Sequence, residues 1–425
     1  MYQQDLGIGI QLTKIVPAYL NLVDSPAMTP SASTGFLKHL IYNGYYLYDD
    51  KNFTSNMNYG MHATQGYYSL VLNFPEFKAH DMWREKVHQR VLTLMNNLAH
   101  EDGTYFESDF GYAMGSIGGF NTLMEYAKQD GWEIPDWYVE RLRKLGIFLM
   151  NITMPNGRIQ DWGDNGSGTV NGTISSILNN IDDPYMKYFV TDGREGEEPN
   201  WTSWYYPDNH VGFSRSAFLD KNAVYAFYDN KAGGIHAHRE GIHFTIEAYG
   251  NYLLTDTGCT SYDNTHPHFN WQRFSSISHN TVEINDTEIG FSQIDSEIDA
   301  MGDEEMVINP LFDTFEAWSD ANKLQGGTNL FRPNRDITYI KPMGLFICSD
   351  YMQPLTGAAM AQKNKYNQAW HTLADAKLTI DPATKQARTN FVGAANLQIV
   401  PLDPEELNLP RDDGDVTPTL DDGYG

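Results

Sequence analysis

The feature that most constrains the fold of this 425-residue chain is a change in hydrophobic periodicity near residue 205. Before that point, apolar residues recur every three or four positions within segments of helix length, as Leu94, Met95 and Leu98 do. This spacing places most of them on one face of a helix. We therefore expect helices over residues 32–48, 61–73, 79–99, 113–129, 135–150 and 173–181.

After residue 205, apolar and polar residues alternate with a period of two. From Ile242 to Ala248 the even positions are apolar and the odd positions are polar, which is typical of a strand with one buried face. Gly250-Asn251 suits a hairpin turn into the next strand. Strands are also expected over residues 252–255, 280–284, 336–340, 344–349, 378–380 and 395–400.

These patterns predict an α+β multidomain chain. Serial helices with short loops favour helical hairpins wound into an incomplete (α/α) toroid over residues 1–204. The alternating segments favour an antiparallel β-sandwich over residues 205–402. With 41% hydrophobic residues the chain is long enough for two cores. Residues 403–425 carry eight acidic residues against one arginine, which indicates a disordered acidic tail.

Charge and composition exclude several kinds of partner. The chain has 29 basic and 55 acidic residues, a net charge of −26, so its overall field repels nucleic acid and anionic membranes. We find no apolar stretch near the ~20 residues of a membrane span and no signal peptide at the start. The two cysteines, Cys259 and Cys348, are expected to be free thiols, because nothing indicates a disulfide.

Histidines and a carboxylate recur in the β half at spacings that suit a metal. His236 and His238 flank one alanine, Asp256 follows eighteen residues later, and His279 opens a His-Asn-Thr sequence. Imidazole and carboxylate groups are ligands that a divalent transition metal prefers. A lone histidine is more often an ordinary hydrogen-bonded residue, so the metal interpretation depends on the surrounding sequence.

That surrounding sequence resembles the heparinase II/III-like polysaccharide lyases. The segment Gly234–Gly258 has a His-x-His, an apolar strand, a turn and then Leu-Leu-x-Asp-x-Gly, and Trp271–Val282 has an arginine followed by His-Asn-Thr-Val. The resemblance implies an (α/α) toroid followed by a β-sandwich. It also implies a structural zinc ion held by His238, Asp256 and His279, with His236 facing the substrate as a catalytic residue.

The helical half carries two further segments of the same family. Asn58-Tyr-Gly-Met opens an expected helix that ends in Phe-Pro-Glu-Phe, and Asp102-Gly-Thr-Tyr-Phe-Glu leads to Tyr112. The resemblance implies that Asn58 neutralises a substrate carboxylate and that Tyr112 is catalytic. Tyr59 and Ala113 stand where some members have histidine, which bears on the substrate subclass. On ordinary grounds Asn58 also suits a helix N-cap, and Tyr112 also suits packing.

Other residues near these motifs are candidates for contact with the sugar chain. An arginine can pair with an acidic sugar, and a tryptophan can border a sugar subsite, although Trp162 lies in an Asp-Trp-Gly-Asp sequence that also suits a simple turn. The expected substrate contacts are His62, Glu107, Trp162, Arg215 and Arg273.

These residue types suit β-elimination at a uronic acid. The C5 proton is too weakly acidic to leave while the adjacent carboxylate is fully anionic, so a neutral amide such as that of Asn58 must stabilise the enolate-like charge. A base removes the C5 proton and an acid protonates the departing O4, roles that Tyr112 and His236 can share. We expect a polysaccharide lyase, periplasmic or secreted, that acts on a uronate-containing acidic polysaccharide.

Two other functions stay open. A glycoside hydrolase on a helical toroid would use paired carboxylates, and a non-catalytic glycan-binding protein would keep the fold without activity. The carboxylates available to a hydrolase are Glu107, Asp109, Asp161 and Asp164.

Strand register sets a condition on the metal site. If the strand from Ile242 pairs with Tyr252 onward around a two-residue turn, Asp256 falls opposite Thr245 and not His238. A straight strand would then hold Asp256 and His238 more than ~20 Å apart at ~3.3 Å per residue. The chain must fold back before the strand, and Gly241 is the expected position.

Overall fold

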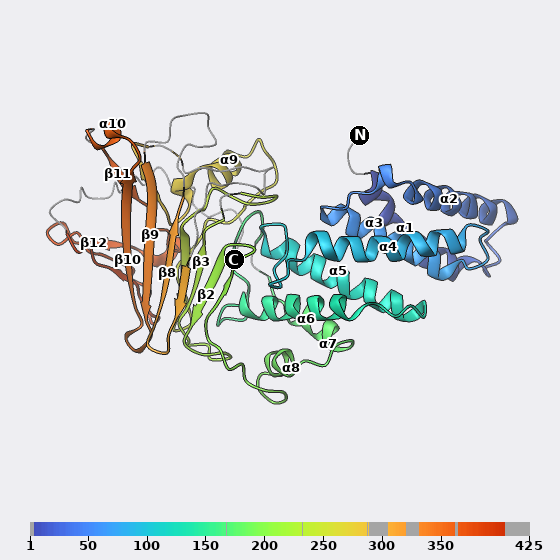
Figure 1. The fold of residues 1–425 in the computed structure, drawn as a ribbon, viewed down its shortest axis with the longest axis horizontal. Coiled ribbons are helices and arrows are strands. Elements are labelled where there is room, and N and C mark those ends of the chain that lie inside the picture. Colours follow the sequence, from blue (N-terminus) through green and yellow to red (C-terminus); the bar gives the residue numbers. More distant parts are fainter. Residues whose placement is uncertain are drawn as a thin grey trace. The chain divides into compact units, whose positions relative to one another are not determined.

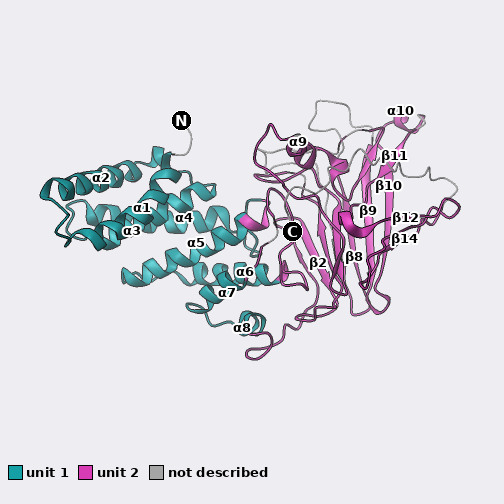
Figure 2. Ribbon diagram, turned by 180° about the vertical axis from the view of Figure 1, so that it is seen from behind, with its two compact units in different colours: residues 1–107, 112–150, 171–190 teal, residues 108–111, 151–170, 191–425 magenta. Residues whose placement is uncertain are grey.

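The computed structural model describes residues 4–166, 168–231, 233–286, 288, 305–319, 331–361 and 364–403. The chain forms two compact units (Figure 2). Unit 1 comprises Met1–Glu107, Tyr112–Met150 and Asn171–Val190, and unit 2 comprises Ser108–Gly111, Asn151–Val170 and Thr191–Gly425. The units interleave along the chain, unlike the contiguous ranges 1–204 and 205–402 expected from the sequence. Apart from Asp403, the expected acidic tail lies outside the described residues.

Unit 1 is helical, as predicted, and all six expected helices are present (Figure 1). Two further helices, at 4–22 and 184–190, were not expected from the pattern. No helix in the described ranges is long and apolar enough to cross a membrane. The helices are α1 (Gln4–Leu22), α2 (Pro30–Tyr48), α3 (Asn58–Asn73), α4 (His80–Leu98), α5 (Phe110–Gln129), α6 (Asp136–Asn151), α7 (Asn171–Leu178) and α8 (Pro184–Val190).

The sequence pattern did not predict helix α1, because this segment contains several residues that disfavour a helix. It contains Gly7, Gly9 and Pro17, which disfavour a helix in isolation. Packing on α3 explains the glycine at position 9. A Cβ on Gly9 would lie 2.3 Å from the backbone oxygen of His62, and one on Gly66 of α3 would lie 2.3 Å from the backbone oxygen of Gly9. Tertiary contact between two helix backbones therefore outweighs local propensity here.

Unit 2 is built from antiparallel strands, as predicted (Figure 1). A five-stranded sheet has the order β1-β2-β3-β4-β5, and a four-stranded sheet has the order β10-β9-β8-β7. Two small sheets, β11-β6 and β12-β13-β14, complete it. The strands are β1 (Trp204–Tyr206), β2 (Val211–Arg215), β3 (Tyr225–Asp229), β4 (His243–Ala248), β5 (Asn251–Leu254), β6 (Val282–Ile284), β7 (Glu305–Ile308), β8 (Phe312–Trp318), β9 (Phe331–Ile340), β10 (Leu345–Pro354), β11 (Tyr366–Gln368), β12 (Thr379–Ile380), β13 (Ala387–Arg388) and β14 (Gln398–Ile399).

The core of unit 2 lies between the two larger sheets. Phe244 and Ile246 of β4 pack with Ile337 of β9 in one buried cluster. Tyr228 of β3 stacks on Phe315 of β8 with ring centroids 5.2 Å apart. The arrangement is a β-sandwich, in which apolar side chains of the facing sheets fill the space between them. Cys259 and Cys348 are free thiols.

The polar face of β4 is buried as well, which the alternating sequence did not indicate. His243, Thr245 and Glu247 are each 1% exposed, because the segment Asn151–Val170 covers this face of the sheet. Within that segment, Gln160 accepts a hydrogen bond from the Thr245 hydroxyl at 3.0 Å. The face of the sheet that points away from the sandwich core is thus also buried, and its side chains are polar.

The β4–β5 hairpin corrects the expected register. Its two-residue turn is Tyr249-Gly250, both with positive φ, and not Gly250-Asn251. A β-bulge between Ile246 and Glu247 then shifts the pairing, so that Ile246 lies opposite Leu254 and Glu247 opposite Tyr252. A bulge adds one residue to one strand and increases the local twist, which no local pattern in this sequence signalled.

Candidate functional site

In unit 1, the two predicted catalytic residues lie at the starts of helices. Asn58 is the first residue of α3, and Tyr112 is the third residue of α5. The N-cap of α3 is Met57, which makes no side-chain cap bond, so the Asn58 side chain does not serve as a cap. Glu107 instead covers the helix end, since its Oε1 accepts the Asn58 backbone N–H at 3.0 Å. A carboxylate is favourable at the positive end of a helix.

The loop before β4 positions His236 in unit 2. The backbone oxygen of Ile235 accepts the N–H of Ser108 at 3.0 Å, and that of His236 accepts the N–H of Asp164 at 3.1 Å. Gly163 permits this close approach, because its φ is +69° and a Cβ there would lie 2.6 Å from the His236 oxygen. His236 itself has a φ of 68°, a left-handed conformation that is uncommon outside glycine. The loop is therefore held from both sides by segments distant in sequence.

Asp164 joins the two histidines of the His-x-His motif. Its Oδ2 lies 2.9 Å from Nδ1 of His236, and its Oδ1 lies 3.1 Å from Nε2 of His238. Arg273, from α9 (Pro267–Phe274), places Nη2 3.3 Å from the same Oδ2. Burial raises the pKa of Asp164, but these hydrogen bonds and charges outweigh it and lower the pKa to about 2. The carboxylate stays ionised and accepts the protons of both imidazoles.

His238, Asp256 and His279 meet in a buried cluster within unit 2. One potential ligand atom of each lies within 4.8 Å of the others. His238 and His279 are 0% exposed and Asp256 is 5% exposed. The cluster forms because the chain folds back before β4, as the metal hypothesis required. The turn lies at Gly241-Ile242, the predicted position, and is closed by the hydrogen bond from the N–H of His243 to the carbonyl of Glu240 at 3.1 Å. Its residue with positive φ is Ile242, at 58°.

Tertiary contacts hold the unusual conformation of Ile242. A β-branched residue with positive φ is strained, so its surroundings must compensate. Its N–H donates to Oδ1 of Asn230 at 3.2 Å, and its carbonyl accepts from Nη1 of the buried Arg335 at 3.0 Å. Its side chain is 0% exposed in the sandwich core. Burial and these two hydrogen bonds thus hold Ile242 in its left-handed conformation.

The protonation pattern of the cluster suits a cation. His238 uses Nε2 to donate to Asp164, and its Nδ1 has no hydrogen-bond partner within the described ranges. His279 uses Nε2 to donate to the carbonyl of Gln272 at 2.9 Å, so its Nδ1 lone pair faces Oδ2 of Asp256 at 2.6 Å. Two lone pairs at that distance repel unless a proton or a cation lies between them. The other oxygen of Asp256 accepts from the N–H of Gly258 at 2.8 Å.

These residues fit a zinc ion. Burial lowers the pKa of His238, so the imidazole is neutral and can bind a metal. Each of the two histidines is oriented through its other nitrogen by a carboxylate or a carbonyl, the usual arrangement around protein-bound zinc. The Asp256 pKa is raised by burial but lowered further by the charge and hydrogen bond of His279. Nitrogen and oxygen donors of this kind are common zinc ligands.

Two of the five predicted substrate contacts do not suit that role in this structure. Trp162 is 1% exposed and its indole donates to Oδ2 of Asp229 at 2.9 Å, so its ring faces are not available to a sugar. Arg215 is 4% exposed, donates to the backbone oxygen of Asn151 and lies over the ring of Phe218 at 4.1 Å. Both side chains stabilise the interior of unit 2.

Of the other three predicted contacts, Arg273 and His62 keep exposed surface, whereas Glu107 is buried. Arg273 keeps 17% of its side chain exposed next to Asp164. His62 is exposed on α3, one turn after Asn58. Glu107 is 1% exposed and bonds to the α3 backbone, which makes it a positioning residue.

Sequence reasoning missed three residues of the site. Asp164 was considered as a hydrolase carboxylate, as part of a turn and as a border of a sugar subsite, but not as a partner of the histidines, and Glu240 and His243 were not considered. Glu240 and His243 form a second potential ligand group with Asp256. Their nearness to the His-x-His motif was a signal, because they lie two and five residues after His238. Nothing in the sequence linked Asp164 to a motif seventy residues away.

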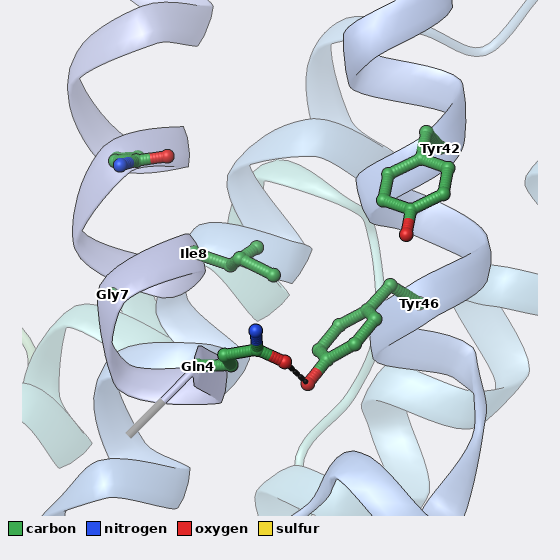
Figure 3. Close-up of a pocket in the computed structure, with 6 residues that line it drawn as sticks. Gln4, Gly7, Ile8, Tyr42 and Tyr46 are labelled. Atoms are coloured by element: carbon green, nitrogen blue, oxygen red, sulfur yellow. Dashed lines mark hydrogen bonds between the residues drawn. The ribbon is translucent and has the colours of Figure 1, made fainter. Parts of the chain in front are cut away.

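A depression in unit 1 offers no comparable chemistry. It lies between α1 and α2 (Figure 3), where the Tyr46 hydroxyl donates to Oε1 of Gln4 at 3.0 Å. Burial raises the pKa of Tyr46, so this tyrosine stays neutral. The residues that line the depression are Gln4, Gly7, Ile8, Gln11, Tyr42 and Tyr46.

The helical unit and the antiparallel sandwich define a class of proteins built from an incomplete (α/α) toroid and a β-sandwich. Two family models match the chain: "Heparinase II/III N-terminus" over residues 3–192 and "Heparinase II/III-like, C-terminal" over residues 209–329. The chain belongs to the heparinase II/III-like family, as the sequence motifs indicated.

Relatives and solved structures agree with this family. The chain is 23% identical over 424 residues to a heparin-sulfate lyase of Pedobacter heparinus, covering 97% of this chain and 60% of that protein. It is 24% identical over 277 residues to a heparin-sulfate lyase of Bacteroides stercoris, covering 61% of this chain and 40% of that protein. The chain therefore spans three fifths or less of these relatives. The crystal structure of heparan sulfate lyase HepC from Pedobacter heparinus superimposes with a TM-score of 0.75 at 20% identity, covering 94% of this chain and 61% of that one.

Proposed function

We propose that this chain is a polysaccharide lyase that cleaves a uronate-containing acidic polysaccharide by β-elimination and leaves an unsaturated uronate end. The names of the two relatives, both heparin-sulfate lyases, support a lyase of this kind. The residues of the family motifs support it as well, since Asn58, Tyr112 and His236 are all present.

The observation that carries the proposal is the His236–Asp164 pair. Because Nδ1 of His236 donates to an ionised, buried carboxylate at 2.9 Å, its proton stays on Nδ1 and the lone pair is on Nε2. A histidine oriented in this way is suited to accept a proton. The same carboxylate stabilises the imidazolium that forms when the proton is taken.

In the proposed reaction, three side chains have the roles that the family motifs give them. Asn58 donates its amide N–H to the uronate carboxylate and stabilises the negative charge that develops on it as the C5 proton leaves. The electron pair of the C5–H bond becomes a C4–C5 double bond, and the C4–O4 bond breaks. Tyr112 and His236 divide the roles of base at C5 and acid at O4 according to the C5 epimer.

Substitutions test the assignment. We expect Asn58→Ala, Tyr112→Phe and His236→Ala each to reduce formation of the UV-absorbing unsaturated product by at least ~100-fold, since general acid–base groups contribute about 10²–10⁴ in rate. The measurement is product absorbance with a panel of heparan-type, alginate-type and chondroitin-type polysaccharides. Tyr42→Phe, at a position 68% exposed on α2, is the control and should be fully active. Full activity in Tyr112→Phe with a folded protein would overturn the assignment.

The electrostatics of Asp164 disfavour it as the acid of a hydrolase. A hydrolase needs one carboxylic acid with a raised pKa, whereas the pKa of Asp164 is lowered to about 2 and Glu107 is bonded to a helix end. A saturated product that incorporates solvent oxygen would nevertheless identify hydrolysis. Tight glycan binding without turnover would identify a binding protein.

The proposal includes a structural zinc ion held by His238, Asp256 and His279. When bound, it would supply positive charge that ties the loop before β4 to the segments that follow β5 and α9, and no substrate contact is required of it. We also propose a periplasmic or secreted location, because a polymeric substrate does not cross a cytoplasmic membrane unaided.

A further inference from the structure

The carboxylate of Glu240 lies next to the buried cluster. Glu240 is 1% exposed. Its Oε1 accepts the N–H of His238 at 3.4 Å, and Gly163 donates a second backbone hydrogen bond to the carboxylate. Its Oε2 has no hydrogen-bond partner among the described residues and lies 3.8 Å from Nδ1 of His279. One side of the carboxylate is therefore anchored, and the other lies near His279 and Asp256.

The position of its proton excludes His243 as a zinc ligand in place of Glu240. His243 also lies within reach of Asp256, with Nε2 at 3.5 Å from Oδ2. Its Nδ1, however, accepts the backbone N–H of Asn280 at 2.9 Å. A neutral imidazole that accepts at Nδ1 carries its proton on Nε2, so that nitrogen donates toward Asp256 and has no lone pair for a metal.

The charges of the buried carboxylates also favour a cation bound at this cluster. Asp256 and Glu240 are both buried, and the histidines around them are neutral when they bind a metal. Two buried carboxylates side by side are strongly unfavourable unless one is protonated or a cation lies between them. Asp164 is balanced separately by Arg273 at 3.3 Å. One divalent cation among His238, His279, Asp256 and Glu240 neutralises the cluster and uses each unpartnered lone pair.

We propose that Oε2 of Glu240 is a fourth zinc ligand, which closes the site of His238, Asp256 and His279 against water and substrate. This inference rests on the zinc ion of the proposed function. Four protein ligands in a tetrahedral arrangement are typical of structural zinc, whereas catalytic zinc keeps one position open. The cluster would then clamp the loop without taking part in the elimination.

Zinc affinity of the full chain tests the ligand. We expect wild type to hold about one zinc ion, and Glu240→Gln to lose at least ~100-fold in affinity in competition with a chromophoric chelator, because even outer-shell partners of a zinc site contribute about 10–100-fold. Glu283→Gln is the matched control, since Glu283 is also buried, at 7% exposure, on β6. Unchanged affinity in Glu240→Gln overturns the proposal, and so does a wild-type protein that binds no zinc.

The cobalt(II)-substituted protein tests closure without relying on a variant. A closed tetrahedral site should give an intense visible spectrum that azide does not change. Glu240→Ala should open one position, so that azide alters its spectrum. A wild-type spectrum that responds to azide would overturn the closed site. Lyase activity is measured separately, so failure of the fourth ligand is distinguishable from failure of the proposed function.

Discussion

At the scale of single residues, Asp164 connects the two functions proposed for the site. One oxygen orients His236, the predicted base or acid, and the other orients His238, a predicted zinc ligand. An ionised carboxylate can accept from both imidazoles, whereas a neutral amide has a single acceptor oxygen. The proposed elimination and the proposed zinc site therefore both depend on the buried charge of Asp164.

Asp164→Asn tests this connection. We expect kcat to fall by at least ~10-fold, because the amide favours the wrong tautomer of one histidine, and zinc affinity to fall by about 10–100-fold. Both quantities can be measured on the same preparation. Asp182→Asn is the control, at an aspartate whose side chain is 87% exposed. If kcat and zinc affinity were both unchanged, the proposed connection would be wrong.

At the scale of elements, the α1–α3 crossing shows how tertiary packing selects residues against local preference. The backbones of the two helices approach so closely at Gly9 that a methyl group there would overlap the carbonyl of His62. At Gly7, half a turn earlier on α1, an added Cβ would have no neighbour within 4 Å.

Alanine at these two glycines should therefore act in opposite directions. We expect Gly9→Ala to lower the free energy of unfolding by about 1–3 kcal/mol through overpacking. Gly7→Ala should leave it unchanged or raise it by up to ~1 kcal/mol, because alanine favours a helix. Urea denaturation followed by helical circular dichroism measures both. Equal effects of the two substitutions would contradict the close crossing.

At the scale of the whole molecule, the chain forms two units, and the metal cluster belongs entirely to unit 2. Binding of an ion to the folded state alone stabilises the unit that holds it. Removal of the ion should therefore affect the two units unequally.

Hydrogen exchange after chelation measures this difference. We expect faster exchange in β4, β5 and α9, which surround the cluster, and little change in α3 and α4. Zinc should restore the original protection. In His238→Ala the exchange should already be fast and should not respond to the chelator. Equal deprotection of both units would argue against a local clamp.

The sequence by itself determined much of this protein. Periodicity of 3.6 and of two indicated helices α2–α7 and strand β4, because those patterns reflect which face of an element is buried. Family motifs placed His238, Asp256 and His279 in one cluster, and the structure brings their ligand atoms within 4.8 Å of one another. The family and the toroid-plus-sandwich fold also followed from sequence.

Only the tertiary structure decided the details on which the site depends. The turn before β4 lies at Gly241-Ile242, as predicted, but its positive φ falls on Ile242, which core burial and two hydrogen bonds hold in place. Asp164 and Glu240 join the cluster through contacts of segments that no local pattern connects. Burial of Trp162 and Arg215 removes them from the surface. Local sequence records what each segment prefers, whereas long-range packing decides which preferences prevail.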